Sequence, residues 1–136
     1  MESDPTDTDA LVLDSSALVA ILLNEPGFSD LAAKVSDAET VIVGAPTLFE
    51  TAMVLQRKVG GTTDLMAFLR VAEAEIVSFG EEHHTAALNA FIRFGKGRHP
   101  ARLNILGCMS YAVAFIAGLP LLYTGDDFSK TDIEAA

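Results

Sequence analysis

Residues 10–24, ALVLDSSALVAILLN, decide the fold of this chain. The first part, ALVLD (10–14), is a short apolar run that ends in an acid and is followed by two serines. This pattern is typical of a buried strand that leads into a helix N-cap. The second part, SALVAILLN (16–24), continues as a short helix. The segment therefore predicts a strand that turns directly into a helix.

The same alternation continues along the chain. Further strands are predicted at 40–44, 75–79 and 119–123. Helices are predicted from Pro26-Gly27 to about Asp37, from Pro46 to Gly60, from Thr62 or Thr63 onward, and over 81–94 and 102–117. Continuous apolar strands that alternate with helices indicate a parallel sheet covered on both faces. We expect one α/β domain over 10–136, a three-layer α/β/α fold with a central parallel sheet of four to five strands.

The composition of the chain indicates the kind of cellular compartment in which it folds. The single cysteine, Cys108, permits no internal disulfide, which suits a reducing compartment such as the cytoplasm. Residues 1–9 carry four acids and no apolar cluster, so we expect a disordered acidic tail. The 21 uncharged residues at 103–123 are long enough to span a bilayer, but GLP at 118–120 divides them into a helix and a strand. No membrane segment is therefore expected.

The charge is unevenly distributed. A formal net charge of −10 argues against non-specific binding of nucleic acid, because phosphate is repelled overall. Four of the nine basic residues nevertheless fall within ten positions around His99, and they are Arg93, Lys96, Arg98 and Arg102. Such a loop could hold phosphate beside a carboxylate site, or could be a solvated Gly- and Pro-rich loop.

Acidic residues occur at three element boundaries in apolar or Gly-rich surroundings: Asp14, Glu50 and the Asp126-Asp127 pair. Two of these positions follow predicted strands, and sites in parallel sheets form beyond the carboxyl ends of strands. Carboxylates gathered there repel one another unless a hard cation such as Mg²⁺ neutralises them. Together the three positions predict a metal site.

Each acid also has a simpler interpretation. Asp14 alone could be a helix N-cap, and the aspartate pair could be ordinary turn residues. Glu50 could form a capping box with Thr47, although Pro46 favours a helix start one residue too early for it. Three hydroxyl side chains could hydrogen-bond the acids or a metal-bound water, or could cap turns, and they are Ser15, Ser16 and Thr124.

Four stretches together match a known family: LVLDSSALVAILLNEP (11–26), APTLFETAMVL (45–55), FGKGRHPARLN (94–104) and GLPLLYTGDDFSKTDI (118–133). They resemble the PIN-domain ribonucleases, specifically the VapC toxins of bacterial type II toxin–antitoxin pairs. The resemblance implies the PIN fold and RNA cleavage that depends on Mg²⁺ or Mn²⁺. It also implies neutralisation by a VapB antitoxin and a homodimer.

The resemblance assigns the acids. It implies that Asp14, Glu50 and Asp126 are the first, second and fourth family acids, which hold the metal, and that Asp127 assists in catalysis. Ser15, Ser16 and Thr124 match the small hydroxyl residues beside such acids. RNA would be guided by a basic set, Lys96, Arg98, His99 and Arg102.

The third family acid is missing. Relatives read LN-x-GDC at the start of the long helix, whereas this chain reads LNILGC at 103–108. Leu106 thus stands at the family's Gly and Gly107 at its Asp, and no carboxylate occurs between Glu82 and Asp126. The alternative to an endoribonuclease is therefore a catalytically inactive PIN module that binds antitoxin or RNA without cleavage.

Overall fold

A parallel sheet forms the centre of the molecule. The computed structural model describes residues 9–136, so the predicted acidic tail lies outside the described residues except for Asp9. The sheet has four strands in the order β3-β2-β1-β4. They are β1 (Ala10–Leu13), β2 (Thr40–Gly44), β3 (Glu75–Val77) and β4 (Leu121–Leu122). The predicted sheet is confirmed, although β3 and β4 are shorter than the apolar runs that predicted them.

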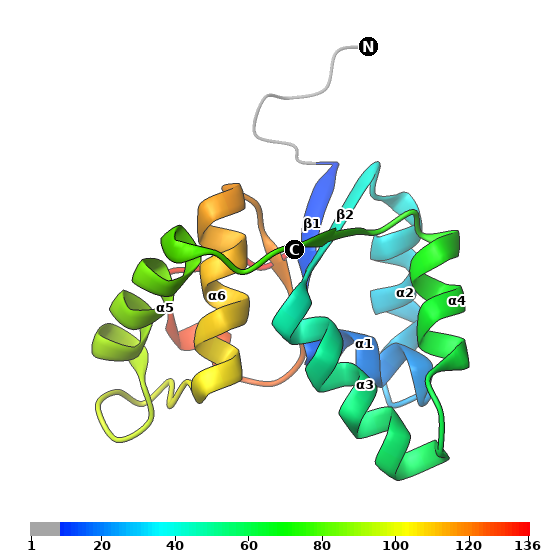
Figure 1. Ribbon diagram of the computed structural model, residues 1–136, viewed down its shortest axis with the longest axis horizontal. Helices are drawn as coiled ribbons and strands as arrows, with labels where there is room; N and C mark the ends of the chain where they lie inside the picture. Colours follow the sequence, from blue (N-terminus) through cyan, green and yellow to red (C-terminus); the bar gives the residue numbers. More distant parts are fainter. Residues whose placement is uncertain (1–8) are drawn as a thin grey trace.

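Helices cover both faces of the sheet. They are α1 (Ser15–Leu22), α2 (Phe28–Asp37), α3 (Ala45–Val59), α4 (Thr63–Val71), α5 (Glu81–Phe94) and α6 (Ile105–Ala117), followed by a short 3₁₀ helix η1 (Phe128–Lys130). Figure 1 shows α1 to α4 on one side of the strands and α5 and α6 on the other. The expected three-layer arrangement is therefore confirmed.

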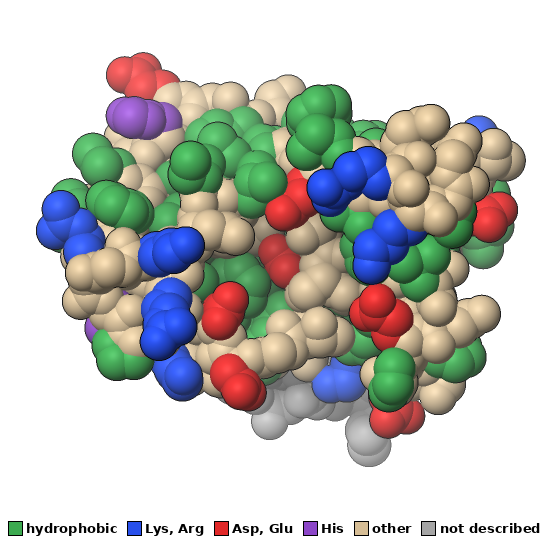
Figure 2. Space-filling view, turned by 90° about the horizontal axis from the view of Figure 1, so that it is seen from below, with side chains coloured by type: hydrophobic (Ala, Val, Ile, Leu, Met, Phe, Trp, Pro, Cys, Tyr) green, Lys and Arg blue, Asp and Glu red, His purple; other side chains and the backbone are tan. Residues whose placement is uncertain are grey.

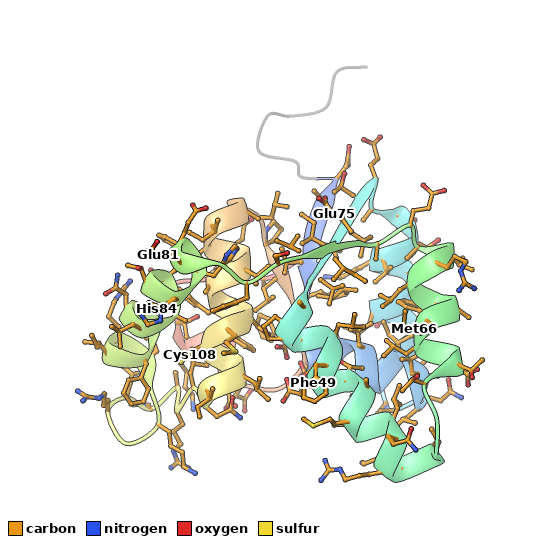
Figure 3. The ribbon with its side chains drawn as sticks, viewed as in Figure 1. Phe49, Met66, Glu75, Glu81, His84 and Cys108 are labelled. Atoms are coloured by element: carbon orange, nitrogen blue, oxygen red, sulfur yellow. The ribbon has the colours of Figure 1, made fainter. Side chains whose placement is uncertain are left out.

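The strands send alternate side chains into two separate cores. Leu11, Leu13 and Val43 pack with the helices α1 to α4. Val12 and Ile42 pack with α5 and α6 in a cluster that also contains Cys108, which Figure 3 labels on α6. Successive side chains of a strand point to opposite faces, so burial of both faces produces an unbroken apolar run.

Helix α6 begins three residues later than predicted. Leu103 forms an isolated parallel bridge with Gly95, and its N–H donates to the carbonyl of Phe94 at 2.9 Å. Asn104 then acts as the N-cap, with its Oδ1 accepting from the N–H of Gly107 at 2.7 Å.

No helix within residues 9–136 is long and apolar enough to cross a membrane.

The start of α3 decides between the two interpretations of Glu50. Gly44 is the N-cap of α3, and Pro46 lies in its first turn. Thr47 is buried inside the helix, and its hydroxyl lies 3.0 Å from the hydroxyl of Ser110 on α6. The capping-box interpretation is therefore wrong, because Thr47 does not cap the helix.

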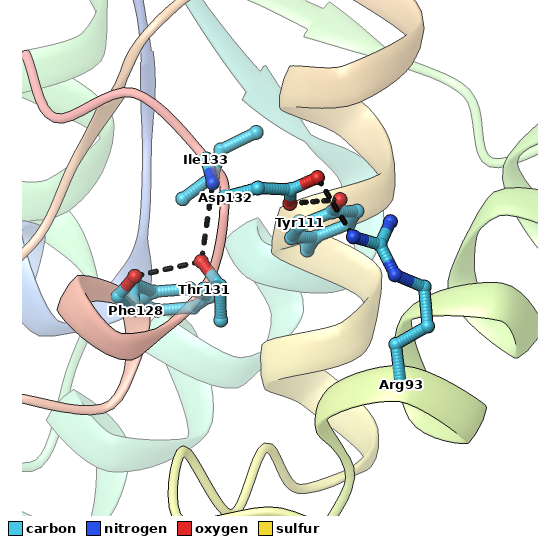
Figure 4. Close-up of polar contacts among 6 residues, drawn as sticks. All are labelled: Arg93, Tyr111, Phe128, Thr131, Asp132 and Ile133. Carbon is cyan, nitrogen blue, oxygen red and sulfur yellow. Dashed lines mark hydrogen bonds and ion pairs between the residues drawn. The ribbon is translucent and has the colours of Figure 1, made fainter.

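The C-terminal segment returns to the free edge of β4. The N–H of Leu121 donates to the carbonyl of Glu134 at 2.9 Å. Figure 4 shows Asp132 accepting a hydrogen bond from Tyr111 of α6 and forming an ion pair with Arg93 of α5 at 3.1 Å. Burial, reinforced by the Asp132 carboxylate, raises the pKa of Tyr111 to about 12, so the phenol remains a donor. These contacts hold the chain that follows β4 against both helices.

Gly44, at the end of β2, lies close to α6, and its replacement tests this packing. A Cβ at Gly44 would lie 2.8 Å from Cγ2 of the buried Val113, whose branched side chain has little rotamer freedom in a helix. We expect Gly44→Ala to lower the free energy of unfolding by about 1–3 kcal/mol in urea titrations. Gly44→Ser should also destabilise, although serine is the better N-cap. A double variant with Val113→Ala that lost stability additively would contradict the proposed clash.

Candidate active site

A cavity of about 180 Å³ lies at the carboxyl edge of the sheet, where β1 runs between β2 and β4. Its lining comes from the segments that follow these three strands and from the start of α6: Asp14, Ser15, Ser16, Glu50, Leu103, Asn104, Gly107, Asp127 and Phe128. Figure 2 shows acidic side chains around a hollow on this face, with basic side chains on both sides of it. The topology thus brings acids from all three predicted positions to one place.

Asp14 is the most buried acid of the cavity, with 5% of its surface exposed. It is the N-cap of α1, and its Oδ2 accepts from the N–H of Ser16 at 3.0 Å and from the Ser16 hydroxyl at 2.6 Å. The Ser16 Oγ in turn accepts from the backbone N–H of Thr124, after β4, at 3.0 Å. Asp14 therefore caps the helix and lines the cavity at once, in an orientation that Ser16 fixes.

Glu50 reaches the same cavity from α3. Burial raises the pKa of its carboxyl above the ordinary value, a hydrogen bond from Ser15 opposes the rise, and the charge of Asp14 adds to it. The only salt bridge within residues 9–136 joins Arg93 and Asp132, so neither carboxylate has a cationic partner there. The two acids therefore repel each other in the metal-free protein.

The two aspartates after β4 are placed differently. The chain turns at Gly125, with a φ of 83° that favours glycine, and Asp127 then lines the cavity. Asp126 is exposed and is not part of the lining, while its carbonyl accepts from the Ser129 hydroxyl at 2.7 Å. The metal-binding role of Asp126 stays a prediction, and the lining favours Asp127 as the acid that faces Asp14.

Gly107 lies in the cavity wall at the first turn of α6, where the family resemblance implies an acid. A Cβ at this position would lie 3.2 Å from Oδ1 of Asn104 and 3.6 Å from Cδ2 of Leu103. A side chain could therefore be added with a small shift of Asn104. Asn104 itself was not predicted as a site residue, and its position just before a helix signals only a cap.

The oxygen atoms in the cavity wall are of the kind that bind a divalent cation, but too few acidic side chains lie close together. Carboxylate and hydroxyl oxygens are the ligands that Mg²⁺ and Mn²⁺ prefer. Among residues 9–136, however, no three His, Cys, Asp or Glu side chains gather closely enough to hold a metal ion. Asp14 and Glu50 therefore form an incomplete carboxylate set, and Gly107 stands where a further ligand would be.

The basic loop lies beside this cavity. Lys96 lines a second cavity, which shares Leu103 and Asn104 with the first. The guanidinium of Arg98 lies 5.2 Å from the centroid of a neighbouring phenylalanine ring, and Arg102 is exposed. These three cationic side chains are available to an anionic ligand, so their role in binding RNA stays a prediction that the geometry allows.

His99 is used within the loop itself. Its Nδ1 accepts from the N–H of Ala101 at 3.0 Å, and its ring packs edge-on against Phe94 with centroids 5.2 Å apart. The imidazole therefore holds the loop against α5. Its predicted contact with RNA is untested.

Comparisons with known proteins agree with the fold. The model of the PIN domain family matches residues 11–134. A protein named Ribonuclease VapC from Mycolicibacterium smegmatis is 39% identical over 127 residues, which are 92% of this chain and 98% of the relative. Ribonuclease VapC30 of Mycobacterium tuberculosis is 38% identical, with 90% and 95% of the two chains covered.

A solved structure has the same fold. The crystal structure of Mycobacterium tuberculosis VapC20, described as a toxin that cleaves the sarcin–ricin loop, aligns with a TM-score of 0.72. The alignment covers 93% of this chain and 98% of VapC20 at 15% identity, so it speaks for the fold alone. Taken with the sequence relatives, it leads to one conclusion: the chain belongs to the PIN domain family and, within it, to the VapC group.

Proposed function

We propose that the protein is a VapC-type endoribonuclease that cleaves phosphodiester bonds of RNA with the help of Mg²⁺ or Mn²⁺. The observation that carries the proposal is one cavity at the carboxyl edge of the sheet, whose wall includes Asp14, Glu50 and Asp127. Relatives named VapC ribonucleases, 38–39% identical over at least 90% of this chain, support it.

Asp14 and Glu50 would hold the cation directly, and Asp127, which lines the same cavity, or its neighbour Asp126 would contribute through a bound water. When bound, such an ion supplies a Lewis acid that stabilises negative charge on the scissile phosphate and makes a bound water more acidic. The protein contributes the orientation of its ligands. Ser16 occupies Oδ2 of Asp14, so the other carboxylate oxygen is left for the cation.

Glu50 is suited to accept a proton. In the metal-free protein, burial raises its pKa above the ordinary value of a glutamate and the charge of Asp14 adds to the rise, which is the direction a general base requires. The Ser15 hydroxyl beside it favours the ionised form, so Glu50 remains able to take up a proton from an attacking water. Lys96, Arg98 and Arg102 would contact the phosphates of the RNA strand.

A second candidate function is an inactive PIN module that binds antitoxin or RNA without cutting. Gly107 and the absence of a three-acid group within residues 9–136 favour it. The two functions differ in one measurable property, the cleavage of RNA on addition of a divalent cation.

Partners follow from the family. We propose that a VapB-type antitoxin binds and neutralises the protein, that the protein forms a homodimer, and that both occur in the cytoplasm. Exposed apolar side chains support a protein contact, since Phe49 and Met53 of α3 are 64% and 43% exposed. Figure 3 shows Phe49 on the N-terminal part of α3. The buried free thiol of Cys108 is compatible with a reducing compartment.

Asp14→Asn tests the enzyme directly. Asparagine is an equally good N-cap and removes the charge that repels Glu50, so the variant should be at least as stable to heat as the wild type. Loss of the carboxylate charge should lower the rate of Mg²⁺-dependent RNA cleavage by at least about 100-fold. Cleavage is measured on labelled single-stranded RNA with EDTA as the blank. Equal rates for the two proteins would remove Asp14 from the mechanism.

Gly107→Asp should strengthen the cation site. The added carboxylate lines the cavity, so we expect Mg²⁺ to bind at least about tenfold tighter and to raise the melting temperature more than in the wild type. Gly107→Asn has the same shape without the charge and serves as the control. If wild type and Gly107→Asp cleave equally, the missing acid is dispensable. If only Gly107→Asp binds Mg²⁺ and cleaves, the natural chain is the inactive module.

Glu50→Gln tests the repulsion between the acids. Because folding raises the pKa of Glu50, its ionised form opposes folding at neutral pH, and this penalty disappears as the pH falls through the raised pKa. In EDTA the variant should therefore be more stable than wild type at neutral pH, and the gain should vanish in acid. Glu75→Gln, at an exposed position on β3, is the control. A gain independent of pH would contradict the electrostatic cause.

A further inference from the structure

A second, largely apolar cavity adjoins the acid cavity. It has a volume of about 370 Å³ and is lined by Phe91, Lys96, Leu103, Asn104, Ile105 and Leu106. This volume lies in the range of small-molecule sites, roughly 300–1,000 Å³. Leu103 and Asn104 line both cavities, so a ligand in one is adjacent to a ligand in the other.

The apolar walls of this cavity are unusually exposed. Ile105 is 76% exposed and Phe91 is 37% exposed, although both are large hydrophobic residues. The ring of Phe91 lies close to the backbone of Gly95, where an added Cβ would be 2.5 Å from its Cδ1. Leu106 completes the wall at the position where the family resemblance implies glycine. The chain thus offers a preformed apolar surface beside the acids.

Polar groups stand at the edge of this surface. Lys96 lines the cavity, and the guanidinium of Arg98 lies 5.2 Å from the centroid of the Phe91 ring. The Oδ1 of Asn104 accepts from Gly107, whereas its amide NH₂ has no hydrogen bond to another residue in the described range 9–136. The apolar surface of the cavity is therefore bordered by the two N–H donors of the Asn104 amide and by the charges of Lys96 and Arg98.

We propose that the second cavity binds a nucleobase of single-stranded RNA, next to the phosphate received by the acid cavity. A base has apolar faces for Phe91, Ile105 and Leu106, and acceptors at its edge for the Asn104 amide. Lys96 and Arg98 provide the charge for its phosphate. These cations favour a nucleotide over an apolar protein segment. The proposal rests on the proposed function, because it assumes that the acid cavity receives an RNA phosphate.

Binding of fluorescent single-stranded RNA in EDTA tests the proposal without cleavage. Ile105→Ser should weaken binding about fivefold to tenfold and leave the salt dependence unchanged, because no charge is lost. Val71→Ser, which removes an 86% exposed apolar side chain from α4, is the matched control and should bind as wild type does. Lys96→Gln should instead weaken binding and reduce the salt dependence.

A second measurement uses the unmodified protein. RNA with an abasic site at successive positions should lose about tenfold in affinity at one position, and Ile105→Ser should be insensitive to the base there. A different outcome is that RNA binds with an affinity that falls as salt rises, while neither the abasic site nor Ile105→Ser weakens binding. That result refutes the nucleobase site and leaves the proposed function standing. If no RNA binds at all, the proposed function fails as well. If Ile105→Ser changes only the oligomeric state in sedimentation, the surface is a contact between copies and the proposal is overturned.

Discussion

The hydroxyl of Ser16 is the contact on which the carboxyl edge of this sheet depends. It donates to Oδ2 of Asp14 and accepts from the backbone of Thr124, so it joins the end of β1 to the loop after β4. This loop carries Asp127, and its far end is fixed through Asp132 to α5 and α6. A single side chain therefore sets both the orientation of the most buried acid and the path of the segment that brings the opposite acid to the cavity.

The fold could be predicted because its strands are buried on both faces. Such strands are continuous apolar runs, and helices with clear caps or proline starts separate them. The start of α6 could not be predicted in this way. Leu103 pairs with Gly95 across the basic loop, and this tertiary contact keeps the chain extended in an apolar segment that local pattern assigns to the helix. The positions of β3 and β4 were right, but their ends depend on neighbours in the sheet.

The site was only partly accessible from the sequence. Asp14 and Glu50 follow neighbouring strands, so topology alone brings them together. Asp126 and Asp127 are adjacent in a turn after Gly125, and only the conformation of that turn decides which one lines the cavity. Asn104 has no local feature beyond a cap. It becomes a site residue because α6 points its first turn at the acids.

At the carboxyl edge of the sheet, the acidic and the basic side chains influence a ligand only over short distances. The Debye length is about 8 Å at physiological salt, so the net charge of −10 on the whole chain is largely screened from an approaching phosphate. Lys96 and Arg98 lie beside the cavity, so a phosphate that reaches it interacts more strongly with them than with the distant acids. Without a carboxylate at Gly107 the metal-free site also carries less repulsion than four acids would create. The proposed base contact of Leu106 and Ile105 lies at the same end of α6 as the missing carboxylate, so under the proposed function contacts with the RNA would compensate for a cation site with fewer ligands.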